Sequence, residues 1–179
     1  PYALAWLLEQ DPAEPFEFGV NISDLITSQC GSEVDAFGMT NRARSQNFVY
    51  WAQYLGYAWR LGVGNFEAIM PDPARAIERH LAHLFGDSKE LLIHELLHAW
   101  AVRSPVLDSG AARKKIVEMC QGTTHRDSML LSRSSSIALL RLEERGIIKL
   151  ERRADALTYT LDTKPNLRPI SHLVWQEGR

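Results

Sequence analysis

The most informative part of the sequence is LSRSSSIALLRLEERGIIKLERRADALTYTL (residues 131–161), because it contains clear signals for both a helix and strands. Ser132 is a favourable helix N-cap and Gly146 suits the left-handed backbone that ends many helices, so residues 132–146 are predicted to form a helix. The runs 147–152 and 157–161 are rich in residues that favour strands, and "RADA" lies between them. The stretch therefore predicts a helix followed directly by a two-stranded hairpin.

The predicted helix has two distinct faces. Ala138, Leu139 and Leu142 lie on one stripe at helical spacing, which predicts burial. Another face carries Ser134, Arg141 and Arg145. The expected helix is therefore amphipathic.

The rest of the chain reads mainly as helix. Helical patterns cover 3–10, 21–29, 40–58, 74–85, 88–103, 108–122 and 125–131. A further hairpin is predicted from 59–61 and 66–70. The order helix–helix–hairpin thus occurs twice, at 21–70 and 111–161. We expect a mainly α fold with small β-hairpin wings, divided into units 1–73, 74–107 and 108–179, the middle unit being a helical linker.

The pattern of residues 111–161 resembles the winged helix-turn-helix superfamily. The resemblance implies a recognition helix, 132–145, whose N-terminal residues enter the major groove of double-stranded DNA. Basic residues of the wing would contact the phosphate backbone. A winged helix that binds another protein is the alternative. The implied DNA-binding residues are Ser132, Arg133, Ser134, Ser135, Ser136, Arg141, Lys149, Arg152 and Arg153.

Residues 21–72 form a fainter copy of the same pattern, with Arg42, Arg44 and Gln46 at the start of its second helix. Its surroundings are acidic, which favours a protein partner for this N-terminal unit. Its aromatic residues are predicted to be core rather than a platform for stacking bases. They are Trp51, Tyr54, Tyr57 and Trp59.

A further resemblance covers most of residues 3–161. "HAWAVRSPVLDSGAARKKIVE" followed by "LSRSSSIALLRLEERGIIKLERRADA" is similar to DpdG-type proteins, with "NFVYWAQYLGYAW" (47–59) and "SPVLDSG" (104–110) as landmarks. Such proteins accompany bacterial gene clusters that install or restrict 7-deazaguanine-modified DNA. The resemblance implies an accessory protein of an antiphage defence system, and it brings no catalytic residue with it.

Charge is distributed unevenly over a chain of net charge −2. Residues 1–110 hold 7 basic and 14 acidic side chains, whereas residues 111–179 hold 13 and 8. The basic C-terminal part is where nucleic acid would bind. No apolar run is long enough to cross a membrane. Cys30 and Cys120 lie far apart without a CxxC motif, which predicts reduced thiols and a cytoplasmic location.

"LLIHELLHAW" (91–100) contains His-Glu-x-x-His, the spacing of a zinc peptidase. His94 and His98 would bind zinc, Glu95 would act as base, and Glu118 is the available third ligand. The continuations that usually follow this motif are missing. Zinc is therefore only an alternative cofactor, and the helix is interpreted as packing.

The sequence favours a non-catalytic DNA-binding or DNA-complex accessory protein without a cofactor. A protein-binding adaptor is the second hypothesis, and a zinc-dependent metallopeptidase is the third.

Overall fold

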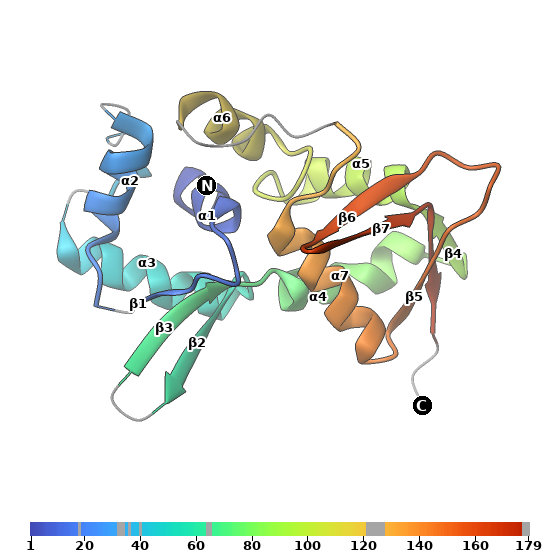
Figure 1. The fold of residues 1–179 in the computed structure, drawn as a ribbon, viewed down its shortest axis with the longest axis horizontal. Coiled ribbons are helices and arrows are strands. Elements are labelled where there is room, and N and C mark those ends of the chain that lie inside the picture. The colour runs from blue at the N-terminus through green and yellow to red at the C-terminus, as the bar shows by residue number, and fades with distance from the viewer. Residues whose placement is uncertain are drawn as a thin grey trace.

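The computed structural model describes residues 1–17, 19–31, 35, 37–39, 41–63, 66–120 and 128–176. Within these residues the chain forms seven helices and eight short strands (Figure 1). The helices are α1 (Tyr2–Glu9), α2 (Ile22–Cys30), α3 (Arg42–Leu55), α4 (Ala74–Phe85), α5 (Ile93–Arg103), α6 (Ala111–Met119) and α7 (Arg133–Glu144). The strands are β1 (Phe16–Glu17), β2 (Ala58–Val63), β3 (Phe66–Pro71), β4 (Glu90–Leu92), β5 (Ile148–Glu151), β6 (Tyr159–Thr163), β7 (Asn166–Ile170) and β8 (His172–Trp175). The expectation of a mainly α fold with small β hairpins is confirmed.

Helix α7 forms as the sequence predicts. The Ser132 side chain accepts a hydrogen bond from the backbone N–H of Ser135, which caps the helix. Ala138, Leu139 and Leu142 are all fully buried. Gly146 follows the helix with a φ of 70°, a conformation that glycine adopts without a steric penalty. Helix α7 lies near the middle of the molecule and packs against α1, α4, β5 and β6 (Figure 1).

The β2–β3 hairpin also forms as expected, and it extends away from the helices (Figure 1). Of the residues expected between the two strands, 62 and 63 belong to β2, and 64 and 65 lie outside the described residues. Strand β1 adds to the free edge of β3, in the segment between the predicted helices 3–10 and 21–29, for which no strand was expected. The sheet order is β1-β3-β2, which leaves β2 at an edge.

The C-terminal strands pair differently from the prediction. Strand β5 pairs with β8, and β6 pairs with β7, so 147–152 and 157–161 do not form the expected wing. The physical reason lies in the residues that follow. Strand β7 follows β6 after a short turn at Lys164 and Pro165, so these two adjacent strands pair with each other. Strand β8 lies between β4 and β5 and is the partner of both.

Several helix boundaries also differ from the prediction. Helix α5 begins at Ile93 rather than Ser88, because residues 90–92 form β4 and pair with β8. The Ser88 hydroxyl donates to the Glu90 carbonyl and caps no helix. Helix α3 ends at Leu55, where Gly56 adopts a φ of 85° and the chain turns into β2. Part of the predicted helix 125–131 lies outside the described residues, and its described part, 128–131, is turn and bridge.

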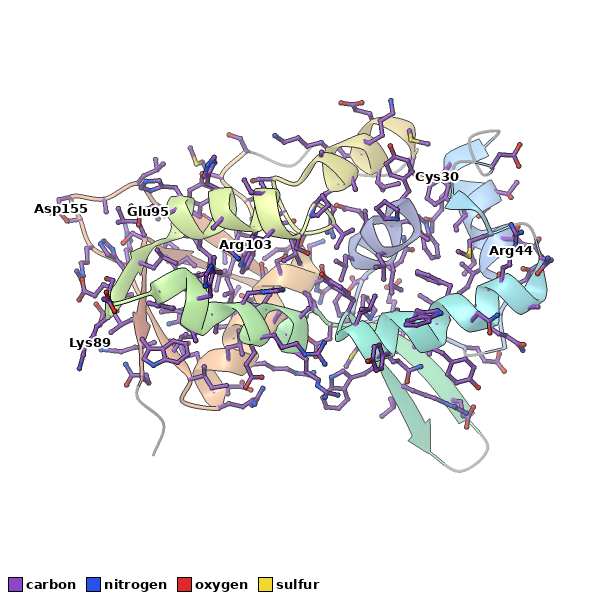
Figure 2. All side chains as sticks on the ribbon, turned by 180° about the vertical axis from the view of Figure 1, so that it is seen from behind. Cys30, Arg44, Lys89, Glu95, Arg103 and Asp155 are labelled. Carbon is purple, nitrogen blue, oxygen red and sulfur yellow. A yellow bond between two sulfur atoms is a disulfide. The ribbon has the colours of Figure 1, made fainter. Side chains whose placement is uncertain are left out.

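Cys30 and Cys120 form a disulfide, so the prediction of reduced thiols is wrong. Their 90-residue separation gave no local signal, and tertiary packing brings them together. Helix α6 packs on α1, and α2 is tied to α1 by a hydrogen bond from the Trp6 indole to Gln29 at 2.6 Å. Figure 2 shows Cys30 at this junction. The cytoplasmic location that rested partly on free thiols remains a prediction.

One connected hydrophobic cluster runs from α1 to β8. Trp6 and Trp100 are the largest fully buried side chains in it. The cluster includes residues from all three predicted units, and the proposed boundaries at 73 and 107 stay a prediction. Over the residues that the structure describes, none of the helices is long and apolar enough to span a membrane.

Candidate nucleic-acid interface

The serines at the start of α7 lie inside the protein. Ser132, Ser134, Ser135 and Ser136 are at most 1% exposed. The Ser134 hydroxyl donates to the Leu8 carbonyl at 2.6 Å, which fastens α7 to α1. The Ser136 hydroxyl accepts from the backbone N–H of Asp162 at 2.9 Å. In this structure the first turn of α7 therefore offers these four hydroxyls no route to the major groove.

Most basic residues of the predicted DNA-binding set face carboxylates. Arg133 pairs with Asp11, and Arg141 pairs with the buried Asp72. Arg153 binds both oxygens of Glu90 at 2.8 Å. The remaining two lie on or next to β5: Lys149 contacts Glu151 at 2.9 Å, and Arg152 is exposed without a partner among the described residues.

These pairs belong to a wider pattern that uses the charge asymmetry within the chain. Among the described residues, five ion pairs that each span more than 60 residues join an acidic residue of the first 110 positions to an arginine beyond position 110. These ion pairs hold the acidic N-terminal part of the chain against the basic C-terminal part. The five pairs are Glu9–Arg113, Asp11–Arg133, Asp72–Arg141, Glu78–Arg145 and Glu90–Arg153.

An arginine-rich pocket of about 470 Å³ opens where β2 meets α4 and α7. Four guanidinium groups and two carboxylates line it, so its lining carries an excess of positive charge. The arginine pocket is lined by Gln53, Ala58, Trp59, Arg60, Asp72, Ala74, Arg75, Glu78, Arg141 and Arg145.

The arginines of this pocket are held to different degrees. Arg145 donates two hydrogen bonds to Glu78, at 2.7 and 2.9 Å, and this pairing raises the pKa of Arg145. Arg141 bonds Asp72 and lies over the Trp59 ring, 4.4 Å from its centroid. Arg75 is exposed and has no carboxylate partner among the described residues. The pocket therefore combines fixed cations with one that is available to a ligand.

Three aromatic residues predicted to be core are exposed instead. Trp51 is 60% exposed, Tyr54 72% and Trp59 45%. Helix α3 uses Phe48, Val49 and Ala52 for its buried side, and residues 51 and 54 lie on the opposite side. The prediction is therefore wrong for these three, whereas Tyr57 is half-buried and its hydroxyl lies 2.7 Å from that of Ser104.

Among the described residues, no third ligand lies beside the two histidines of the zinc motif. His94 and His98 are exposed on α5, and Glu95 of the same helix accepts a hydrogen bond from the Leu92 backbone N–H at 3.2 Å (Figure 2). Glu118 is on α6, 3.5 Å from Lys115. Among the residues whose placement is described, no three His, Cys, Asp or Glu side chains group together to hold a metal ion.

Sequence reasoning missed the pocket residues Arg60, Arg75 and Trp59. A signal was present, because residues 41–63 contain no acidic side chain although residues 1–110 as a whole are strongly acidic. The segment also contains three arginines. Local charge over about twenty residues was therefore more informative than the charge of the entire N-terminal part.

Comparisons with known proteins identify the family. Neither curated proteins nor solved structures gave a match. A comparison with protein families matched residues 1–156 as DpdG-like. The match covers most of the chain, including α1 to α7, the arginine pocket and β5. The chain belongs to the DpdG-like family.

Proposed function

We propose that this protein is a non-catalytic accessory of a DNA-modification system and that it contacts the DNA backbone through the arginine pocket. Membership of the DpdG-like family is consistent with such a system. The observation that carries the DNA contact is the gathering of Arg60, Arg75, Arg141 and Arg145 around one open pocket. A guanidinium group is well suited to a phosphate, because its N–H groups match the phosphate oxygens in pairs.

The placement of the side chains favours backbone contact over base reading. The serines that would approach base edges are buried. Arg75 is exposed, and the Arg145 side chain is half exposed although it pairs with Glu78. Contacts with phosphates position a protein on DNA without specifying sequence. We therefore expect binding that depends strongly on salt and weakly on base sequence.

The decisive experiment measures binding of the full chain to a fluorescent duplex by anisotropy, over a series of salt concentrations. Arg75→Ala is the first variant, because Arg75 forms no ion pair with a described residue and its removal should leave the fold undisturbed. Loss of one phosphate contact should weaken binding severalfold and reduce the slope of log affinity against log salt by about one.

Lys114→Ala is the matched control. Lys114 is exposed on α6, outside the pocket, and its removal changes the net charge equally. The control should bind like the unmodified protein. An equal loss in both variants would show a general charge effect and contradict a site at the pocket.

Arg152→Ala tests the predicted contact beside β5 separately. Arg152 and Lys149 are the exposed members of the predicted DNA-binding set. If the duplex also touches this region, Arg152→Ala weakens binding as Arg75→Ala does. Absence of duplex binding even at low salt would overturn the proposed function and favour the protein-binding adaptor.

A further inference from the structure

We propose that the α3–β2 surface, formed by Tyr50, Trp51 and Tyr54 of α3 and Trp59 of β2, binds single-stranded DNA by stacking its unpaired bases. This inference deepens the proposed function and rests on it. It adds which form of DNA is recognised and which residues recognise it. The arginine pocket would hold phosphates, and the aromatic rings would hold bases.

The first argument is the exposure of these rings. Tyr50 is 53% exposed, and the exposed fractions of the other three residues lie between 45% and 72%. Large aromatic side chains dominate core packing when they are buried. A group of them left on the surface therefore marks an interaction site more often than isolated apolar residues do.

The second argument is geometry. The Trp51 and Tyr54 rings meet edge to face with centroids 5.7 Å apart. Tyr50 lies one helical turn before Tyr54 and so belongs to the same side of α3. Gln53 of α3 and Trp59 of β2 both line the arginine pocket, so the helix and the strand that carry the surface approach each other at the pocket.

The third argument is charge. No acidic side chain occurs in residues 41–63. Arg60 of β2 pairs with Glu67 of the neighbouring strand β3. Arg44 is exposed at the start of α3, at the outer end of the helix in Figure 2. Arg75 and Arg141 lie at the pocket, next to Trp59. Aromatic rings among arginines suit a polyanion with accessible bases, and this is how sequence-tolerant single-strand binding works.

Duplex DNA cannot use such a surface fully. Its bases are stacked on each other, and only their edges reach the grooves. A single strand presents base faces that stack on tryptophan and tyrosine. We therefore expect aromatic substitutions to weaken binding of single strands more than binding of duplexes, while arginine substitutions weaken both.

The experiment measures the affinity of the full chain for an oligothymidine of about 12 nucleotides, a typical length for such sites. The same preparation is tested with the duplex used above. Trp51→Ala and Tyr54→Ala should each weaken oligothymidine binding by about tenfold. Both side chains are largely exposed, so thermal unfolding should show that the variants remain folded.

Val102→Ala is the matched control. Val102 is an apolar residue on α5 that is 72% exposed, like Tyr54, but it lies outside the α3–β2 surface. The control should retain the affinity of the unmodified protein for both ligands. An equal loss in the control would contradict a specific surface.

The outcomes separate this inference from the proposed function. Duplex binding without oligothymidine binding, or oligothymidine binding that is insensitive to both aromatic substitutions, overturns the inference and leaves the pocket proposal intact. Tighter binding of oligouridine than of oligothymidine overturns the assignment to DNA. Dimerisation that Trp51→Ala abolishes, in a protein that binds no oligonucleotide, assigns the surface to a second copy of the chain. Failure to bind any DNA overturns both proposals.

Discussion

At the scale of single residues, Arg113 is an arginine held inside the protein by several polar partners. Its side chain is almost completely buried, it pairs with Glu9, and it donates to the Leu8 carbonyl at 2.7 Å. Desolvation by burial lowers its pKa to about 10, and Asp108 opposes this shift. The group therefore remains cationic at neutral pH. It fastens α6 to the end of α1.

Replacement of Arg113 by alanine should destabilise the protein strongly. Glu9 would remain buried without its partner, which typically costs about 3–5 kcal/mol. Urea denaturation followed by circular dichroism measures the loss. The double variant Glu9→Leu/Arg113→Met should recover part of it, because Glu9 is no longer left as a buried charge without its partner. Lys114→Ala should change stability by less than about 0.5 kcal/mol. An Arg113→Ala midpoint equal to that of the unmodified protein would contradict the ion-pair argument.

Glu143 should make stability depend on acidic pH. Burial raises the pKa of Glu143, but hydrogen bonds from Arg168 and from the Leu150 N–H outweigh it, so the folded-state pKa lies below 4.5. The stabilisation is present above pH 4.5 and is lost as pH falls through the lower, folded-state value. Glu143→Gln should be less stable at neutral pH and show a shallower loss of stability below pH 4.5. Denaturation midpoints over this range measure the difference, and parallel curves would contradict it.

At the scale of elements, local signals predicted helices better than strand pairing. The helix expected over 21–29, observed as α2, and helix α4 from residue 74 to 85 occur as the sequence indicates. The β2–β3 hairpin does too, because its partners are adjacent in the chain. Strand β8 joins β4 to β5 across many residues, and no local pattern specifies such a pairing.

Gly56 lies where α3 ends, β2 begins and α4 packs closely against the backbone. It ends α3 with a positive φ, and a Cβ placed there would lie 2.9 Å from the Ala76 backbone nitrogen of α4. Gly56→Ala should therefore destabilise the protein by about 2–4 kcal/mol, through backbone strain and the clash with α4.

Gly146→Ala is the control for this prediction. Gly146 also has a positive φ, 70°, but a Cβ there meets nothing within 4 Å. Its substitution should cost only the conformational strain, about 1 kcal/mol. Equal losses of thermal stability in the two variants would show that the contact with α4 does not matter.

At the scale of the whole molecule, long-range links connect the two ends of the chain. The five ion pairs and the Cys30–Cys120 disulfide each join segments at least 60 residues apart. Helix α1 is central to these links, because it contacts α6 and α7. We infer that the N-terminal and C-terminal parts stabilise each other.

The disulfide should contribute measurably to stability. Closing a loop of 90 residues restricts the unfolded chain, and the contribution is about 2–5 kcal/mol. Denaturation with and without a reductant measures it, together with titration of free thiols in the unfolded protein. Cys30→Ala/Cys120→Ala should match the reduced protein and not respond to reductant. Two titratable thiols before reduction would contradict the disulfide.

Secondary-structure elements that depend on neighbouring residues could be predicted from the amino-acid sequence. It specified helix α7 through its serine cap, its apolar stripe and Gly146, and it specified the β2–β3 hairpin. It also indicated the DpdG-like family through short landmark strings. These features depend on neighbouring residues only, so they can be read along the chain.

The positions of the charged and aromatic side chains depend on long-range contacts, which are seen only in the tertiary structure. Arg133 and Arg141 were expected on a DNA-facing surface, but they pair with Asp11 and Asp72, which the chain brings from more than sixty residues away. Trp51 and Tyr54 were expected in the core, but they lie on the surface because α3 buries its other side. Burial and charge pairing depend on distant partners, and only folding brings those partners into contact.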